Sequence, residues 1–353
     1  MSATNLPRSL RFRRRLTSLE ALGTPGIRRF RNAIQVAIAA FLLYSGWQFY
    51  LFVEHFNSGG QAPYVPRPAA VEAFLPLSAL VALRAWLGTG VADNVHPAGV
   101  VILLAAVFTA LLFGKGLCSW LCPVGALSEA LWRLGRRVCG RSFSLPKYLD
   151  WTLQAPKYLL LFFFVKAIFF DMSAAAASYF LQTSYNKVAD VKMLYFFLQP
   201  GAEVVTFLGV LAALSLVLPN LWCRYLCPYG ALLGLLSILA PFKVTRDDAR
   251  CTGCRRCTRA CPERLIVHEA EQVDSPSCSR CLDCVQTCPR AGALYVGAPR
   301  PLRLRAVWAY PALFLGTFFV AILVAQVAGY WQSSLTYDAY VTLLPKVDAL
   351  SHP

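Results

Sequence analysis

The stretch Cys251-Thr-Gly-Cys254-Arg-Arg-Cys257-Thr-Arg-Ala-Cys261-Pro262 recurs 27 residues later as Cys278-Ser-Arg-Cys281-Leu-Asp-Cys284-Val-Gln-Thr-Cys288-Pro289. Both copies read C-x2-C-x2-C-x3-C-P. In a reducing compartment, cysteines spaced this closely supply thiolates to metal centres rather than to disulfides. The duplicated spacing therefore predicts iron–sulfur chemistry, in which electrons move one at a time.

The spacing is the bacterial two-cluster ferredoxin pattern, in which the fourth cysteine of each run binds the cluster of the other run. It predicts an α+β ferredoxin-like module over 241–300 that holds two [4Fe–4S] clusters. The expected ligands of cluster 1 are Cys251, Cys254, Cys257 and Cys288. The expected ligands of cluster 2 are Cys278, Cys281, Cys284 and Cys261.

Long apolar runs surround this module. The chain has 353 residues, of which 57% are hydrophobic, and a formal net charge of +16. A helix that crosses the hydrocarbon core of a bilayer needs about 20 apolar residues. Five runs approach that length and predict an α-helical polytopic membrane protein with about five transmembrane helices: roughly 33–53, 96–114, 153–171, 202–219 and 306–328.

A sixth apolar run, 73–89, is shorter and carries Arg84. An arginine at the centre of the bilayer costs about 2.5–3.5 kcal/mol on insertion scales. If this run crossed the membrane, the basic segment 115–157 would lie on the outer side. We therefore interpret 73–89 as a re-entrant or interfacial helix on the outer side.

Basic residues are distributed unevenly between the segments that connect the apolar runs. With the N-terminus inside, the inner segments hold 8, 7 and 13 Lys and Arg residues and the outer segments hold 2, 2 and 1. The inner segments are 1–32, 115–157 and 220–305, and the outer segments are 54–97, 172–201 and 329–353. The positive-inside rule then predicts a cytoplasmic basic arm and ferredoxin module, a last transmembrane helix within 301–328, and a periplasmic tail. In so apolar a chain, basic patches favour anionic lipid over nucleic acid as a partner.

A second repeat lies within the membrane part. The segment 118–127, CSWLCPVGAL, recurs 105 residues later as CRYLCPYGAL over 223–232, with seven of ten positions identical. Each copy directly follows an apolar run. The pattern predicts two parallel helical-hairpin repeats, 33–135 and 136–240, each ending in a CxxxCP motif.

The CxxxCP spacing places two sulfurs on one face of a helical turn, because residues i and i+4 share a face. Pro123 and Pro228 then interrupt the helix. If the repeats pack about a pseudo-twofold axis, Cys118, Cys122, Cys223 and Cys227 converge at the inner membrane face. Three interpretations stay open: a metal site for iron–sulfur, Cu(I) or zinc, a redox dithiol pair, or small residues that allow tight packing.

These motifs together resemble the NapH/NosR group of membrane polyferredoxins, and the related copper-handling CcoG/RdxA/FixG proteins share the same core. The resemblance covers roughly residues 30–300. It implies a bacterial cytoplasmic (inner) membrane protein that exchanges electrons between the quinone pool and iron–sulfur clusters, and serves a periplasmic or cytoplasmic redox partner.

The chain departs from these relatives at its ends. NosR carries a periplasmic flavin-binding domain before its membrane part, whereas here about 30 residues precede the first apolar run. No flavin domain of that kind is expected. CcoG-type proteins carry a folded periplasmic domain, whereas the tail here has about 25 residues, too few for a core of its own. NapH-like proteins typically stop after the ferredoxin module, whereas here the apolar run 306–328 adds a helix after it.

Oxidation of a quinol releases two protons as well as two electrons, so a quinone site needs titratable groups near the membrane edge. The candidates are His55, Asp93, His96, Lys166, Asp171 and Glu203, with Glu54 and Glu72 near them. Either histidine can accept a proton near neutral pH. A haem between His55 and His96 is disfavoured because the chain has only four histidines.

Two functions are compatible with these motifs. The first is a quinol dehydrogenase-like electron-transfer subunit, an oxidoreductase component. The second is a copper-handling protein, a cupric reductase or metal-cofactor assembly factor that uses the CxxxCP thiols. Three methionines and four histidines provide no copper-collecting tract, which favours the first function.

Overall fold

The computed structural model describes residues 26–139, 145–297, 303–304 and 307–351. Most of the predicted basic arm 1–32 lies outside the described residues. The chain divides into two compact units, and each is described by itself. Unit 1 consists of Met1–Val36, Thr109–Ala126 and Leu233–Thr317, and unit 2 of Ala37–Phe108, Leu127–Leu232 and Phe318–Pro353. The ferredoxin module thus shares a unit with the first CxxxCP motif, across the boundaries of the sequence repeats.

Each of the five predicted apolar runs contains a helix. Three helices are long and apolar enough to cross a membrane: α2 (Ile27–Asn57), α7 (Lys147–Val165) with its π-helical extension η2 (Lys166–Asp171), and α15 (Ala309–Val327). The helices α10 (Ala189–Leu198) and α11 (Ala202–Val217) are bent by 73° and form a fourth span if counted as one. The remaining run forms α4 (Pro97–Phe113), which has 17 residues. The protein is therefore a helical membrane protein, and the count of about five spans stays a prediction.

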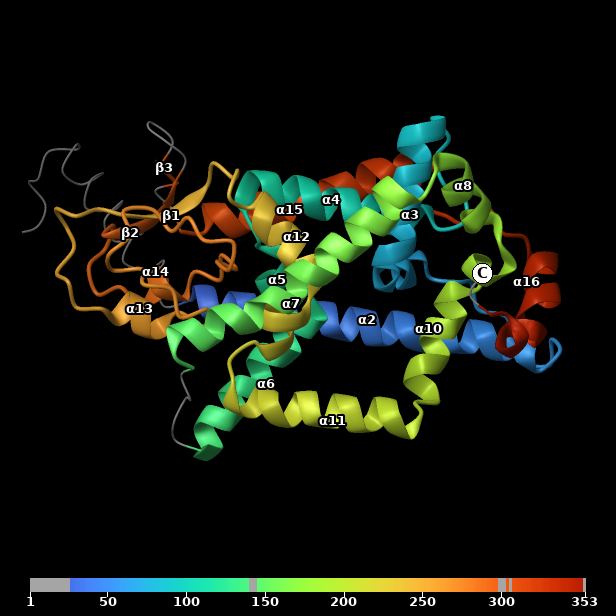
Figure 1. Ribbon diagram of the computed structural model, residues 1–353, viewed down its shortest axis with the longest axis horizontal. Helices are drawn as coiled ribbons and strands as arrows, with labels where there is room; N and C mark the ends of the chain where they lie inside the picture. The colour runs from blue at the N-terminus through green and yellow to red at the C-terminus, as the bar shows by residue number, and fades with distance from the viewer. Residues whose placement is uncertain (1–25, 140–144, 298–302, 305–306, 352–353) are drawn as a thin grey trace, which may run out of the picture. The chain divides into compact units, whose positions relative to one another are not determined.

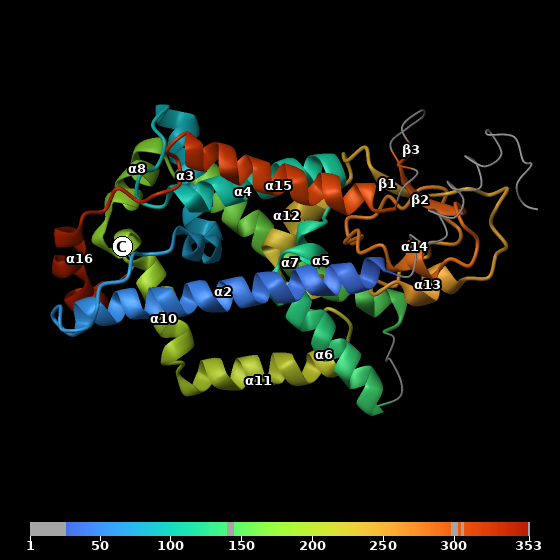
Figure 2. The ribbon, with the colours of Figure 1, turned by 180° about the vertical axis from the view of Figure 1, so that it is seen from behind.

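The sixth apolar run is divided into two short helices. A 3-10 helix, η1 (Ala69–Phe74), precedes α3 (Pro76–Thr89), whose 14 residues extend about 21 Å and fall short of a bilayer core of about 30 Å. Val81, Ala82 and Ala85 of α3 pack against α8 (Ala174–Gln182) in a small apolar core. Figures 1 and 2 show α3 and α8 side by side. The short turn α9 (Ser184–Lys187) connects α8 to α10.

The C-terminal tail is folded. It forms α16 (Tyr337–Leu343) and the 3-10 helix η4 (Leu344–Ala349). Its buried side chains share a core with one end of α2 and the start of α10: Phe49, Phe52, Val53, Phe56, Val188, Val191, Tyr340, Leu344 and Val347. The tail is too short for a core of its own, as the sequence indicates, yet it completes a core that α2 supplies.

The ferredoxin module is an α+β structure with an internal repeat. Strand β1 (Lys243–Arg246) pairs antiparallel with β2 (Leu294–Gly297), and β2 pairs antiparallel with β3 (Arg303–Leu304). The two cysteine runs contain the five-residue helices α13 (Arg256–Ala260) and α14 (Asp283–Thr287), whose first residues are 27 positions apart. Both helices lie beside the small sheet in Figure 1.

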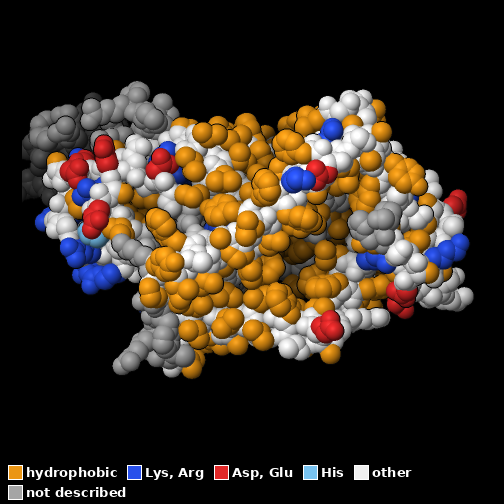
Figure 3. Space-filling model, viewed as in Figure 1, with side chains coloured by type: hydrophobic (Ala, Val, Ile, Leu, Met, Phe, Trp, Pro, Cys, Tyr) orange, Lys and Arg blue, Asp and Glu red, His pale blue; other side chains and the backbone are white. Residues whose placement is uncertain are grey.

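Apolar side chains cover α7 and α11 on their outer surfaces. Leu159, Phe162 and Phe163 of α7 are exposed, as are Val205 and Phe207 of α11. Figure 3 shows this surface as nearly continuous orange over both helices. So large an exposed apolar surface would promote aggregation in water, and it is the surface that lipid chains cover.

Candidate functional site

Two cavities in the ferredoxin module are each lined by four cysteines. Cavity 1, about 360 Å³ including the space open to solvent, is lined by Cys251, Cys254, Cys257 and Cys288. Cavity 2, about 350 Å³ on the same measure, is lined by Cys261, Cys278, Cys281 and Cys284. Each set takes three cysteines from one run and the fourth from the other. Sulfurs gathered around a cavity of this size form a donor set that fits an iron–sulfur cluster.

The backbone bends at equivalent positions of both runs. Arg255 and Leu282 precede α13 and α14 with φ values of 59° and 64°, in the left-handed region. Non-glycine residues hold such angles only where their surroundings impose them. Leu282 is fully buried, so the bend in the second run is locked by packing. The repeated bend wraps each run around its cavity.

Two of the cysteines that line cavity 2, Cys281 and Cys284, are buried, and two guanidinium groups lie beside this cavity. Burial raises the pKa of Cys281 and Cys284 well above the usual thiol value, while the positive charge of Arg31 lowers the pKa of Cys281. Arg31 is completely buried and donates to the carbonyl of Cys281 at 2.8 Å and to Asp283 at 3.3 Å. Arg280 donates to the sulfur of Cys278 at 3.2 Å. These cations compensate thiolate charge beside buried sulfurs.

Cavity 1 differs from cavity 2 in the exposure of its cysteines. Cys254 is exposed, and a hydrogen bond from the backbone N–H of Arg256 lowers its pKa. Arg246, Arg255 and Arg290 also line this cavity. The two cavities therefore have matching sulfur donors and different surroundings.

The two CxxxCP motifs share one backbone geometry. In the first, Cys118 lies in α5 (Leu117–Trp120), and the N–H of Cys122 reaches back five residues to the carbonyl of Leu117 at 2.9 Å. Pro123 then begins α6 (Pro123–Cys139). Proline suits this first helical position because its missing N–H would have no intrahelical partner.

The second motif repeats this arrangement. Cys223 lies in the π-helical turn η3 (Trp222–Leu226), the N–H of Cys227 donates to the carbonyl of Trp222 at 3.0 Å, and Pro228 begins α12 (Pro228–Leu236). The second cysteine of each copy thus closes a wider turn than the α-helical one expected from the spacing. Such π-type turns are often found at functional sites.

The residues between the paired cysteines have different partners in the two copies. In unit 1, Ser119 donates to the carbonyl of Ser279 at 2.7 Å and Trp120 to that of Arg280 at 3.2 Å. The first motif is therefore joined directly to the cysteine run that lines cavity 2. In unit 2, two of the three residues between Cys223 and Cys227 bind Asp150 of α7: Arg224 at 2.9 and 2.6 Å and Tyr225 at 2.6 Å.

The two cysteine pairs belong to different units, so the convergence of Cys118 and Cys122 with Cys223 and Cys227 stays a prediction. Neither unit, within its described residues, gathers three His, Cys, Asp or Glu side chains in the geometry of a single-ion site. The eight ferredoxin cysteines instead surround the two cavities.

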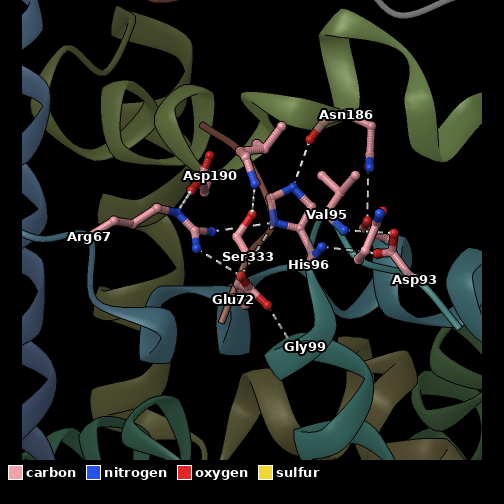
Figure 4. Close-up of polar contacts among 12 residues, drawn as sticks. Arg67, Glu72, Asp93, Val95, His96, Gly99, Asn186, Asp190 and Ser333 are labelled. Atoms are coloured by element: carbon pink, nitrogen blue, oxygen red, sulfur yellow. Dashed lines mark hydrogen bonds and ion pairs between the residues drawn. The ribbon is translucent and has the colours of Figure 1, made fainter. Parts of the chain in front are cut away.

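Unit 2 contains a buried charged cluster around His96 and Arg67 (Figure 4). Arg67 donates to Asp190 at 2.7 Å, to Glu72 at 2.9 Å and to Nδ1 of His96 at 3.3 Å. The Nε2 atom of His96 lies 2.7 Å from the carbonyl oxygen of Asn186. A carbonyl oxygen only accepts, so Nε2 carries a hydrogen and a neutral His96 accepts from Arg67 through Nδ1.

This cluster favours an additional proton. The charges of Arg67, Glu72 and Asp190 leave one net negative charge among side chains that are almost completely buried. Burial alone would lower the pKa of His96, but its contact with Glu72 and the negative charges of Asp190 and Glu72 raise the pKa above the usual value. His96 lies one residue before α4, and Nδ1 is 3.6 Å from Glu72 Oε1, which faces the position of the added proton.

The other quinone-site candidates have local partners. Asp93 accepts from the backbone N–H of Val95 and of His96, both at 3.0 Å, and so caps the turn before α4. His55 contacts the carbonyl of Ala62 at 2.6 Å and the hydroxyl of Tyr337 at 2.8 Å.

Lys166, the lysine within a predicted membrane helix, forms an ion pair with a residue of the same helix. Lys166 binds Asp171 at 2.6 Å, and both side chains are about half exposed. Among the described residues Lys166 makes no ion pair with Glu203, another candidate, because its partner Asp171 lies on the same short helix. Glu203 is exposed at the start of α11.

Sequence reasoning missed several residues of these sites. Arg67 is one of two basic residues in the outer segment 54–97, and Asp190 lies in the outer segment 172–201, where neither belongs to a motif. Arg31 was included only in the basic arm. A usable signal was the scarcity of outer cations: a charged residue retained in so neutral a segment indicates a buried partner.

Comparison with protein families identifies the same segments. A family model described as a 4Fe-4S binding domain matches twice, at residues 95–142 and 201–246, once around each CxxxCP motif. A second model, described as a 4Fe-4S dicluster domain, matches residues 243–289. The chain therefore carries iron–sulfur binding domains.

Several curated proteins are similar to this chain. YccM of Escherichia coli (strain K12), a protein named for electron transport, is 38% identical over 328 residues, which are 92% of either chain. The regulatory protein NosR of Pseudomonas aeruginosa is 30% identical over 50% of this chain and 25% of its own length. The ferredoxin-type protein NapH of Escherichia coli (strain K12) is 28% identical over 48% of this chain and 56% of its own. No solved structure matches.

Proposed function

Because the chain belongs to the NapH/NosR-type family of ferredoxin-type membrane proteins, we propose that it transfers electrons between the quinone pool and two [4Fe–4S] clusters for a separate redox partner. One observation carries this proposal: the first CxxxCP motif is hydrogen-bonded directly to the cysteine run of cavity 2. A ferredoxin joined in this way to membrane helices cannot diffuse as a soluble carrier. The proposed setting is the bacterial inner membrane, with the module in the cytoplasm and the tail in the periplasm.

The residues have distinct roles in this proposal. Clusters, when bound, supply one-electron redox chemistry. The four cysteines of each cavity hold one cluster, the cross-run ligands being Cys288 in cavity 1 and Cys261 in cavity 2. Arg31 and Arg280 compensate thiolate charge at cavity 2. The hydrogen bonds from Ser119 and Trp120 keep the first motif at a fixed distance from that cavity.

We place a third redox or metal site at Cys118, Cys122, Cys223 and Cys227. The equivalent turns, each closed by the second cysteine, support this role. Soft thiolates suit an iron–sulfur cluster, Cu(I) or zinc, and two thiol pairs can also cycle with disulfides. Which of these the site uses decides how electrons leave the membrane part.

The quinone site is assigned to the region of His96 on the outer side. Its neighbours Arg67, Glu72 and Asp190 favour an added proton, and a quinol must release protons as it is oxidised. Asp93 holds the backbone of the histidine in place. His55, Lys166, Asp171 and Glu203 remain secondary candidates.

The second candidate function is copper handling, as a cupric reductase or assembly factor. The observation that favours it is the matched geometry of the two thiol pairs, which soft Cu(I) would bind. The same CxxxCP residues would then bind the substrate metal.

The experiment is anaerobic purification in lipid nanodiscs, quantitation of iron and copper, and EPR before and after addition of a quinol analogue. We expect about eight iron atoms per chain from the two ferredoxin clusters, and reduction of these clusters by quinol. A His96→Gln variant should keep its iron and be reduced more slowly. Clusters that stay oxidised at every quinol potential would exclude electron transfer from the quinone pool to the clusters. Stoichiometric copper that is lost on Cys118→Ser and on Cys223→Ser would instead establish the second function.

A further inference from the structure

We propose that the rim of cavity 1 is the docking site of a soluble, acidic single-electron carrier, and that Arg255, Arg256 and Arg259 bind it. The inference rests on the proposed electron-transfer function, because it names the class of partner that exchanges electrons with the ferredoxin module. Its evidence is the different exposure, charge and contacts of the two cavities.

The contacts of cavity 2 are made with the ends of helices in unit 1. Ser119 and Trp120 bind Ser279 and Arg280, and Arg31 binds Cys281 and Asp283. The backbone N–H of Arg28 donates to Gln286 at 2.9 Å. These contacts all fall on the second cysteine run, so cavity 2 is the end of the module that faces the first CxxxCP motif.

The rim of cavity 1 carries an exposed cysteine, which cavity 2 lacks. Cys254 is exposed together with Thr252 and Gly253 before it. Electron transfer between proteins needs close approach of the two redox centres, and an exposed ligand offers that approach. Cavity 1 is therefore the end of the module at which a second protein can exchange electrons.

The charge around this opening is strongly positive. Residues 246–260 contain five arginines and two aspartates. Both aspartates are already engaged, since Asp248 binds Arg246 at 2.6 Å and Asp247 lies 3.7 Å from Arg250.

The remaining arginines of this stretch have exposed side chains, and one of them also has a backbone partner, since Arg259 donates to the carbonyl of Cys254 at 3.1 Å. Arg255, Arg256 and Arg259 are exposed, and no carboxylate among the described residues forms an ion pair with them. Arg255 lines the cavity itself, and Arg256 and Arg259 lie on α13. Figure 3 shows blue side chains gathered over α13. A rim of this charge attracts an acidic partner and speeds its encounter.

A protein fits this surface better than a lipid headgroup does. Surfaces that bind a membrane combine basic residues with large apolar side chains that enter the bilayer. The stretch 251–260 contains only cysteine, threonine, glycine, arginine and alanine. It therefore offers charge without an apolar anchor, as expected of a transient electrostatic contact between redox proteins.

The redox step is simple in its balance. One electron passes between the reduced or oxidised carrier and the centre held by Cys251, Cys254, Cys257 and Cys288. One partner is oxidised by one electron, the other is reduced by one electron, and no bond is formed or broken.

The test measures binding and redox exchange separately. The holoprotein in nanodiscs of neutral lipid is titrated with a plant-type [2Fe–2S] ferredoxin, an acidic carrier, at several salt concentrations. The variant Arg256→Glu/Arg259→Glu is compared with Arg28→Glu/Arg29→Glu, which makes the same charge change at exposed residues of the same unit. Iron content and EPR spectra of both variants confirm that their clusters are intact.

We expect the α13 variant to weaken ferredoxin binding on the order of tenfold to a hundredfold at low salt and to flatten its salt dependence. The α2 variant should change binding by less than about threefold. Equal losses in the two variants, binding that does not depend on salt, or equally tight binding of a basic cytochrome would each overturn the proposal. The proposal would also be overturned if the α13 variant no longer bound anionic vesicles but still bound ferredoxin, because the arginines would then bind lipid headgroups. Quinol reduction is measured in parallel, so failure of the proposed function is seen independently of docking.

Discussion

The indole N–H of Trp120 donates a hydrogen bond to the carbonyl oxygen of Arg280 at 3.2 Å, across 160 residues of sequence. Trp120 lies between Cys118 and Cys122, and Arg280 lies between Cys278 and Cys281. The bond therefore joins the middle of a membrane thiol motif to the middle of a ferredoxin cysteine run. At the equivalent place in the second motif, Tyr225 binds Asp150 instead. The duplicated motif thus has one copy attached to the ferredoxin module and one attached to a membrane helix.

The change Trp120→Phe should loosen this attachment. It removes the donor and leaves a buried carbonyl without that partner, at a cost of about 1–3 kcal/mol. Hydrogen exchange should increase over residues 276–286, and iron content should be nearly unchanged. Tyr225→Phe is the matched control, because it removes a hydrogen bond from the other copy. Equal exchange over 276–286 in both variants would show that the Trp120 bond does not hold the module.

Ligand replacement should reveal the crossed cysteine sets. Cys261→Ser and Cys281→Ser remove sulfurs from the same cavity although they come from different runs. Each should lower the iron content from about eight to about four and leave the same EPR signal. Cys288→Ser should leave the other signal. If Cys261→Ser instead behaves like Cys251→Ser, each run holds its own cluster and the crossed assignment is wrong.

Arg31→Gln should make the cluster of cavity 2 harder to reduce. The guanidinium is buried beside Cys281, and its removal takes away a positive charge that stabilises the extra electron. A redox titration followed by EPR should show one midpoint potential shifted to a more negative value. Arg28→Gln provides the control, because its exposed side chain should leave both potentials in place. A shift in both clusters, or in neither, would contradict the placement of Arg31.

The cysteine sets and the apolar runs could be predicted because the local spacing of residues in the sequence indicates both. Three of the four ligands of each cluster occur within one cysteine run, and a helix that spans lipid needs a continuous apolar run. The turn at Cys122 could not be predicted, because an α-type and a π-type turn place nearly the same residues on one face. The division of the 73–89 run into two helices was missed although Pro76 begins the second.

The cluster around His96 shows the limit of local reasoning. Arg67 and Asp190 are 123 residues apart, and neither lies in a recognisable motif. Their contact depends on how the segment before η1 packs against the start of α10. The histidine could be selected as a candidate from its type and position. The partners that set its proton affinity could only be found from the structure.

The raised pKa of His96 predicts that unit 2 loses stability at alkaline pH. A group whose pKa is higher in the folded protein stabilises it fully below the unfolded value of about 6.5, and this contribution is lost as the pH rises through the folded value. The thermal midpoint in nanodiscs should therefore decrease from pH 6 to pH 9. His96→Gln should reduce this dependence, since the amide can still donate to Asn186 but does not titrate. An identical slope in the variant would show that another group is responsible.

Gly125 provides a test of the CxxxCP geometry that does not depend on any bound metal. A Cβ at this position would collide with the carbonyl of Cys118, so the first turn of α6 requires glycine where it passes Cys118. Gly125→Ala should lower the stability of the apoprotein by about 1–3 kcal/mol, because backbone has to move. Gly209→Ala in α11 is the matched control: nothing lies near its Cβ, and alanine favours a helix over glycine by about 1 kcal/mol. The two changes should therefore have opposite signs in thermal unfolding. If Gly125→Ala is as well tolerated as Gly209→Ala, the close turn around Cys118 is not present in the folded protein, and the shared geometry of the two thiol motifs loses its support.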